Sequence, residues 1–102
     1  MNPATAASAA RAHERREIRE ALAAAGGFAA RCTLLATLLV QGDERALPIR
    51  LGRLLRMAKG IGDRRVGELL RDAEMHPARE LRRVGELTES ERYRLARGLA
   101  RR

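Results

Sequence analysis

The pattern of apolar positions predicts a chain built from helices. Over residues 4–25 nearly every residue favours helix, and the spacing expected of one helix face is followed by Ile18, Ala21, Leu22 and Ala25. The first half of this segment is alanine and polar or charged residues, so we expect residues 1–15 to project into solvent or to fray. The glycine pair at 26–27 is expected to end the helix.

A second helix is predicted from Phe28 to about Gln41. Its apolar positions repeat at helical spacing, at Phe28, Cys32, Leu35, Ala36 and Leu39, and Leu34 and Leu38 widen the apolar arc. This width indicates a helix that is buried on most sides or paired with a partner. A third helix is predicted from Pro48, placed as the first helical residue, to about Ala58. Its inward positions are expected to be Leu51, Leu54, Leu55 and Met57 or Ala58.

Two further helices complete the pattern. Asp63 is a predicted N-cap, and the buried stripe of the fourth helix is expected at Val66, Leu69, Leu70 and Ala73. A connector with Pro77 and Gly85 has room for one short turn around residues 79–82. Thr88 to Glu91 reads as a capping box that starts a last helix, with Leu95, Ala96 and Leu99 as its buried stripe. We therefore predict an all-α fold of about five helices, with residues 16–102 as a single domain behind the polar start at 1–15.

Composition and charge narrow the classes of partner. The 102 residues suit one domain, and with only 2% aromatic residues the core must be largely aliphatic. The net charge of +8 is uneven: residues 1–49 carry six arginines against five acids, and residues 50–102 carry fourteen arginines and Lys59 against eight acids. Such an excess indicates a polyanionic partner, DNA or RNA first and an acidic membrane second.

The residues that could carry catalysis are few. His13 lies among polar residues, His76 precedes a proline, and Cys32 lies on the apolar stripe of the second helix, and none has a partner evident in the sequence. We expect no enzyme activity, no metal, no cofactor and no small-molecule substrate, and Cys32 as a core residue. The chain start lacks the apolar region of a secretory signal, and no apolar run is long enough to cross a bilayer. The expected location is the cytoplasm, without a membrane.

The turn "KGIGDRR", residues 59–65, combines three features that favour a phosphate. Gly60 and Gly62 can present backbone N–H groups without a side chain in the way, and Ile61 can anchor the turn in the core. The helix that follows adds free N–H groups and partial positive charge. Lys59, Arg64 and Arg65 supply cations around it, whereas Asp63 would repel a phosphate. The alternative is a purely structural turn with a C-cap glycine, a buried isoleucine and a capped helix.

A second group of cations lies in the following connector, at Arg79, Arg82 and Arg83. One helical turn there would bring Arg79 to the same side as Arg82 or Arg83. A solvated charge cluster is the alternative. Two cationic loops flanking one helix could instead clamp a duplex backbone, and such contacts position a protein without reading sequence.

The segment "LGRLLRMAKGIGDRRVGELLRDAEMHPARELRRVG" resembles the helix-two-turn-helix segment of the actinobacterial integration host factors. In that family a leucine pair precedes a G-V-G turn, and here these are Leu54-Leu55 and Gly60–Gly62; the similarity spans roughly residues 16–99. The resemblance implies a nucleoid-associated protein that binds double-stranded DNA with little sequence preference and takes part in chromosome organisation, with the motif at about 49–87. It implies DNA contacts at Lys59, Gly60, Ile61, Gly62, Arg64, Arg65, Arg79, Arg82 and Arg83, and the N-terminal helix could reach the duplex too. Lys59 stands where the family usually has proline, and the second helix is more apolar, which indicates a divergent paralogue.

Two other functions stay open from the sequence. "GIGDRRVGELL" with "VGELTESERYRL" is also similar to the helix-two-turn-helix protein of the head of the small ribosomal subunit, an RNA-binding family whose chain begins near the motif. The helical segment ahead of the motif here favours the DNA-binding family. DNA glycosylases with this motif carry an N-terminal catalytic proline and a β domain that this chain lacks. A protein-interaction module using the apolar second helix is the other alternative; we expect a monomer, with self-association through that helix as a variant.

Overall fold

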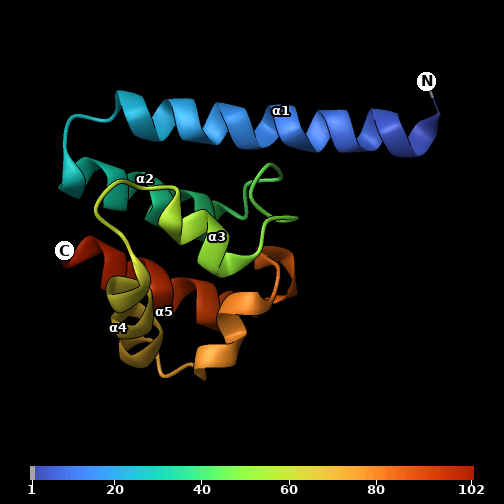
Figure 1. Cartoon of the computed structure of the whole chain (residues 1–102). Coiled ribbons are helices and arrows are strands. Elements are labelled where there is room, and N and C mark those ends of the chain that lie inside the picture. Colours follow the sequence, from blue (N-terminus) through green and yellow to red (C-terminus); the bar gives the residue numbers. More distant parts are fainter. Residues whose placement is uncertain (1) are drawn as a thin grey trace.

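Five α-helices and two short 3₁₀ helices make up the computed structural model, which describes residues 2–102 (Figure 1). They are α1 (Pro3–Ala24), α2 (Phe28–Gln41), α3 (Leu51–Arg56), α4 (Asp63–Asp72), η1 (Pro77–Leu81), η2 (Val84–Glu86) and α5 (Glu89–Ala100). Over these residues there is no strand, and the only bridge pairs the backbones of Arg50 and Arg83. The predicted all-α fold with five helices is confirmed.

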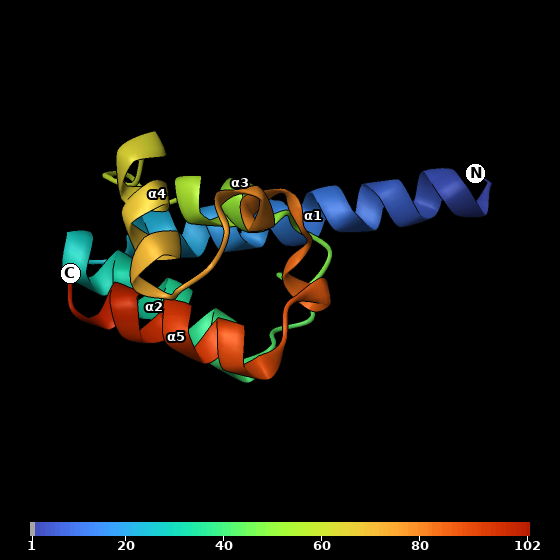
Figure 2. The same ribbon diagram turned by 90° about the horizontal axis from the view of Figure 1, so that it is seen from below.

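Helices α2 and α5 pack side by side. Their facing sides contribute Leu35, Leu39, Leu95 and Leu99 to one aliphatic core. Arg92 of α5 donates to the carbonyl of Leu39 at 2.9 Å, a carbonyl in the last turn of α2 that also accepts from the Gly42 amide. In the view from below, α3 lies on the side away from α2 and α5, and α4 extends from that side to pack against α5 (Figure 2).

Helix α1 crosses one side of the bundle and is attached by its second half. Its buried residues are Ile18 and Leu22, and residues 2–10 are exposed. Its N-terminal end extends beyond the other helices in both views (Figures 1 and 2). The predicted projection of the polar half is therefore seen for residues 2–10, while Met1 lies outside the described residues. Ala21, expected in the buried stripe, is exposed, because two large side chains suffice for a helix that contacts the core along a narrow strip.

Two predicted helix starts are wrong. The third helix begins at Leu51 and not at Pro48, because the backbone before it pairs with the connector: the Val84 amide donates to the Ile49 carbonyl at 2.9 Å, and the Leu51 amide donates to the Arg82 carbonyl at 2.8 Å. These bonds hold Arg50 in an extended conformation, and residues 44–48 before it form turns and not a helix.

The N-cap of α4 is Gly62, and Asp63 is its first helical residue. Arg56 binds the Asp63 carboxylate from outside the helix at 2.9 Å, so that side chain does not cap the helix. The predicted Thr88–Glu91 capping box is confirmed, with the Glu91 amide donating to the Thr88 hydroxyl and the Thr88 amide to the Glu91 carboxylate. The connector forms two 3₁₀ helices where one turn was expected. Over residues 2–102, none of the helices has both the length and the apolar content that crossing a membrane requires.

Candidate nucleic-acid interface

The turn at 59–62 joins α3 to α4 and has a rigid side and an open side. On the rigid side Ile61 is buried, as predicted, and Gly60 has a φ of +101°, a conformation that favours glycine. A Cβ on Gly60 would lie 2.7 Å from the ring of Phe28 at the start of α2. Glycine at this position is therefore required both by backbone conformation and by packing.

The open side of the turn is at Gly62. Its φ of −108° suits any residue, and no protein atom lies within 4 Å of the place a Cβ would take. The first-turn N–H groups of α4, which have no partner within the helix, follow directly. A phosphate oxygen could reach these N–H groups without passing a side chain at residue 62.

The cations around the turn are engaged to different degrees. The Arg65 guanidinium lies 4.7 Å from the centre of the Phe28 ring, a cation–π contact that fixes the side chain and preserves its charge. The Arg64 side chain is 92% exposed and pairs with Glu68 at 3.2 Å, a surface pair that water and salt weaken. Lys59 is exposed at the start of the turn. All three cations are exposed and close to Gly62 in the chain.

Asp63, which would repel such an anion, is bound by a cation of its own. Arg56 donates from Nε to Asp63 at 2.9 Å and pairs through Nη2 with Glu80 at 3.0 Å. Gly52 leaves room for this arrangement, because a Cβ there would lie 2.5 Å from the Arg56 guanidinium. The Asp63 charge beside the turn is thus partly compensated within the protein.

The three predicted connector arginines have different surroundings. Arg79 makes two hydrogen bonds to Glu91, from Nε at 3.0 Å and from Nη2 at 2.6 Å, and this contact lowers the pKa of Glu91 below its ordinary value. Arg79 therefore fastens η1 to the start of α5. Arg82 is 3.6 Å from Glu86 on the surface, and Arg83 is exposed. Arg82 and Arg83 are the connector cations most accessible to an outside anion.

The two predicted groups lie at opposite ends of α3. The Arg83 backbone pairs with Arg50 immediately before this helix, whereas the Lys59–Gly62 turn follows it. The structure thus places both groups next to the same short helix and does not merge them into one cluster.

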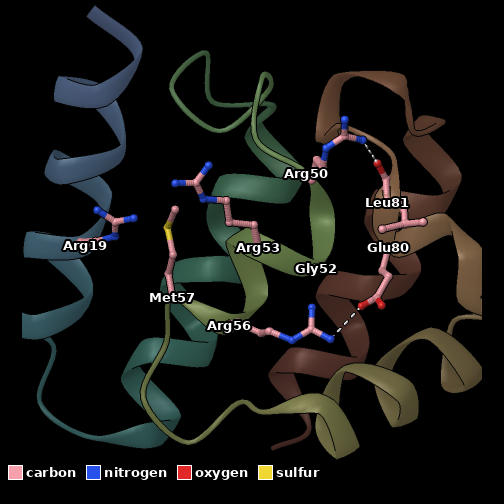
Figure 3. A pocket seen from close by; sticks show the side chains of 8 residues that line it. All are labelled: Arg19, Arg50, Gly52, Arg53, Arg56, Met57, Glu80 and Leu81. Carbon is pink, nitrogen blue, oxygen red and sulfur yellow. Dashed lines mark hydrogen bonds and ion pairs between the residues drawn. The ribbon is translucent and has the colours of Figure 1, made fainter. Parts of the chain in front are cut away.

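Further arginines, not selected from the sequence, line two adjoining hollows between α1, α3 and the connector. One hollow, of about 520 Å³, is lined by Arg19, Arg50, Gly52, Arg53, Arg56, Met57, Glu80 and Leu81 (Figure 3). The other, of about 260 Å³, is lined by Ser8, Arg11, Arg15, Pro48, Ile49, Arg50, Arg53 and Arg83. In Figure 3 the guanidinium groups of Arg19 and Arg53 point toward each other from α1 and α3. The sequence feature that could have indicated these arginines is the four-residue spacing of Arg11, Arg15 and Arg19, which places them along one flank of a helix.

Cys32 lies in the core, as predicted, and burial raises the pKa of its thiol. A neutral, inaccessible thiol is a poor nucleophile and a poor metal ligand. Among the groups that this surface offers to a ligand, the guanidinium groups, the Lys59 ammonium group and the backbone N–H groups favour phosphate, whereas the carboxylates of Asp63, Glu68 and Glu80 are each paired with an arginine.

The described residues form a small all-helical protein with an arginine-rich face made by α1, α3 and the connector. No protein-family model matches the chain, and neither the curated proteins nor the solved structures contain a significant match to it.

Proposed function

We propose that the protein is a non-enzymatic DNA-binding protein that contacts the phosphates of double-stranded DNA largely independently of sequence, as an architectural protein of the nucleoid. The observation that carries this proposal is the open approach to Gly62 at the start of α4, flanked by Lys59, Arg64 and Arg65. N–H groups at a helix N-terminus together with cations bind phosphate without reading bases. Any preference among duplexes would then come from groove shape and deformability.

A second contact is proposed for the connector side. Arg82 and Arg83 lie at the other end of α3 from the turn, so phosphates on one duplex backbone could bind at both ends of this helix. Arg79 would join them only by exchanging Glu91 for a phosphate, and we assign it a supporting role. Contacts at two points would fix the orientation of the duplex on the protein.

The test compares two double variants with the same change in charge. Lys59→Ala with Arg65→Ala is expected to weaken duplex binding about tenfold or more, and equally for unrelated sequences, because phosphate contacts carry no sequence information. The control is Arg97→Ala with Arg101→Ala, two exposed arginines at the far end of α5. Affinity is measured by fluorescence anisotropy and helix content by circular dichroism.

Equal loss in both double variants would contradict a specific role for the turn. Since Arg65→Ala also removes the contact with Phe28, the single variant Lys59→Ala separates binding from folding. Competition between duplex DNA and a structured RNA shows which nucleic acid the protein prefers to bind. A clear preference for RNA would replace the proposal with the ribosomal-type function.

A second candidate function, protein interaction, is favoured by an apolar groove between α2 and α5. Val40 is 40% exposed and Tyr93 49% exposed beside a lining of Thr33, Ala36, Thr37, Gln41, Ala96, Arg97 and Ala100. Sedimentation without DNA tests this candidate. A stable oligomer that lacks DNA affinity and dissociates on Tyr93→Glu would favour interaction over DNA binding, and a monomer that binds duplex would exclude self-association through this face.

A further inference from the structure

The smaller hollow between α1, α3 and the connector is unusually rich in positive charge. Five arginines line it, namely Arg11, Arg15, Arg50, Arg53 and Arg83, beside Ser8, Pro48 and Ile49, and its lining holds no acidic residue. Arginine is always charged at physiological pH, so the hollow brings five full positive charges together. The lining comes from three separate parts of the chain, and only the tertiary fold creates the group.

The orientation of α1 sorts its charges between two sides. Ile18 and Leu22 attach the helix to the core, and the stripe of arginines runs along one flank of this attachment toward α3. Glu17 lies on the other flank, 3.8 Å from Arg45. Glu17 therefore does not neutralise the arginines that face the hollow.

The lining arginines are also poorly compensated by the rest of the protein. Over residues 2–102 no carboxylate lies within ion-pair distance of Arg11, Arg15, Arg53 or Arg83, although Arg56 in the neighbouring hollow is paired with Glu80. Arg50 donates to the carbonyl of Leu81, which leaves its charge uncompensated. Like charges held in one hollow repel each other, and a bound anion would remove this cost.

We infer that this hollow is a binding site for consecutive phosphate groups. A guanidinium group donates two parallel N–H bonds to a phosphate, so several guanidinium groups around one hollow fit a chain of phosphates better than a single ion. The chemistry is shared by a free oligophosphate and by the backbone of a nucleic-acid strand. The inference goes beyond the proposed function, because the site is separate from the Lys59–Gly62 turn and needs no duplex; it shares only Arg83 with the proposed connector contact.

The first experiment uses sodium tripolyphosphate as the probe, titrated into the full-length protein by isothermal calorimetry at low salt. The hollow variant is Arg15→Gln with Arg53→Gln. The matched control is Arg16→Gln with Arg71→Gln, which changes the charge equally at exposed positions outside the hollow lining. We expect the hollow variant to lose about tenfold or more in affinity and the control to lose little, since only the former removes charge-assisted hydrogen bonds.

Absence of tripolyphosphate binding by the unmodified protein, or equal loss in both variants, would overturn the site. Circular dichroism checks that each variant keeps its helices. In NMR spectra of the unmodified protein, the amide chemical shifts that change when tripolyphosphate is added must belong to residues of the hollow lining. If the hollow variant unfolds, Arg11→Gln with Arg83→Gln provides the same test from other lining residues.

A competition experiment distinguishes a free oligophosphate from a nucleic-acid backbone as the occupant of the hollow. It also allows this inference and the proposed function to be refuted separately. If a short duplex displaces tripolyphosphate, and the hollow variant weakens both ligands, the occupant is the nucleic-acid backbone. If the duplex does not compete, the occupant is a free oligophosphate. Tripolyphosphate binding without any duplex binding would refute the proposed function alone, and duplex binding with no tripolyphosphate site would refute this inference alone.

Discussion

At the scale of single residues, Gly60 and Gly62 have different roles although they are two positions apart. Gly60 has a positive φ and lies against Phe28, so a side chain there strains the backbone and meets the ring. Gly62 has an ordinary φ and open space around it, so the fold does not need glycine there. What Gly62 preserves is access from outside to the start of α4.

These roles predict opposite outcomes for two alanine substitutions. Gly60→Ala is expected to destabilise the protein by about 1–3 kcal/mol, because it adds backbone strain and a steric conflict. Gly62→Ala should leave the free energy of unfolding within about 0.5 kcal/mol and still weaken duplex binding, because the methyl group narrows the approach to the N–H groups. Chemical denaturation and fluorescence anisotropy measure the two effects. Unchanged DNA affinity in Gly62→Ala would indicate a purely structural turn.

Arginine also shows that residue type alone does not define a role. Arg92 and Arg94 donate to the carbonyls of Leu39 and Ala73 at the ends of α2 and α4, and Arg102 binds Glu68 and Asp72. These side chains stabilise helix ends and helix contacts. They belong to the strongly basic second half of the chain, yet much of their hydrogen-bonding capacity is used inside the protein.

At the scale of elements, the contact between Arg79 and Glu91 joins η1 to α5. Glu91 also accepts from the Thr88 amide in the capping box, so one carboxylate serves both the helix start and the connection. The Arg79 hydrogen bond keeps the pKa of Glu91 below that of a free glutamate. The charged form of Glu91 is therefore favoured by folding.

Glu91→Gln is expected to lower stability in a pH-dependent way. A carboxylate whose folded pKa is depressed stabilises the protein above its unfolded pKa, and this contribution is lost as the pH falls through the folded pKa. The difference in the free energy of unfolding between the unmodified protein and the variant should be largest near about pH 7 and shrink toward about pH 3. Urea unfolding at both pH values measures it. The control Glu89→Gln, at an exposed position in the same helical turn, should show a smaller difference, and a pH-independent effect of Glu91→Gln would contradict this role.

At the scale of the whole molecule, tertiary structure redistributes the charge that the sequence assigns to its two halves. Residues 1–49 have a net charge near zero, yet Arg11, Arg15 and Arg19 of α1 join the arginines around α3. The basic face is therefore built from both halves. The groove between α2 and α5, by contrast, has a single charged residue, Arg97, in its lining.

Binding of duplex DNA through the basic face should depend strongly on salt concentration. If about six phosphates are neutralised, the logarithm of the binding constant should fall against the logarithm of salt concentration with a slope of about −5. Anisotropy titrations of one duplex at several salt concentrations give this slope. An affinity that hardly changes with salt would contradict a backbone-dominated mode of binding.

Periodicity predicted most of the fold because burial of aliphatic stripes determines helix positions. The buried stripes of α4 and α5 and the capping box at Thr88 are confirmed. In α2 the predicted burial holds for Cys32, Leu35, Leu38 and Leu39, whereas Phe28, Leu34 and Ala36 are only partly buried. The start of α3 was missed because the backbone pairing of Ile49 with Val84 joins residues 35 positions apart and leaves no local signal. The Asp63 N-cap was wrong for a similar reason, since Arg56 binds that carboxylate from another helix.

The sequence by itself determined the helical class, the aliphatic core, the excess of positive charge and the turn at residues 59–62, because these follow from composition and short-range spacing. Only the tertiary structure decided which arginines pair internally, that Gly62 stays open while Gly60 is packed, and that arginines of α1 meet those of α3 in one hollow. The physical reason is that pairing, burial and like-charge proximity depend on distances between residues far apart in the chain, which a linear pattern does not contain.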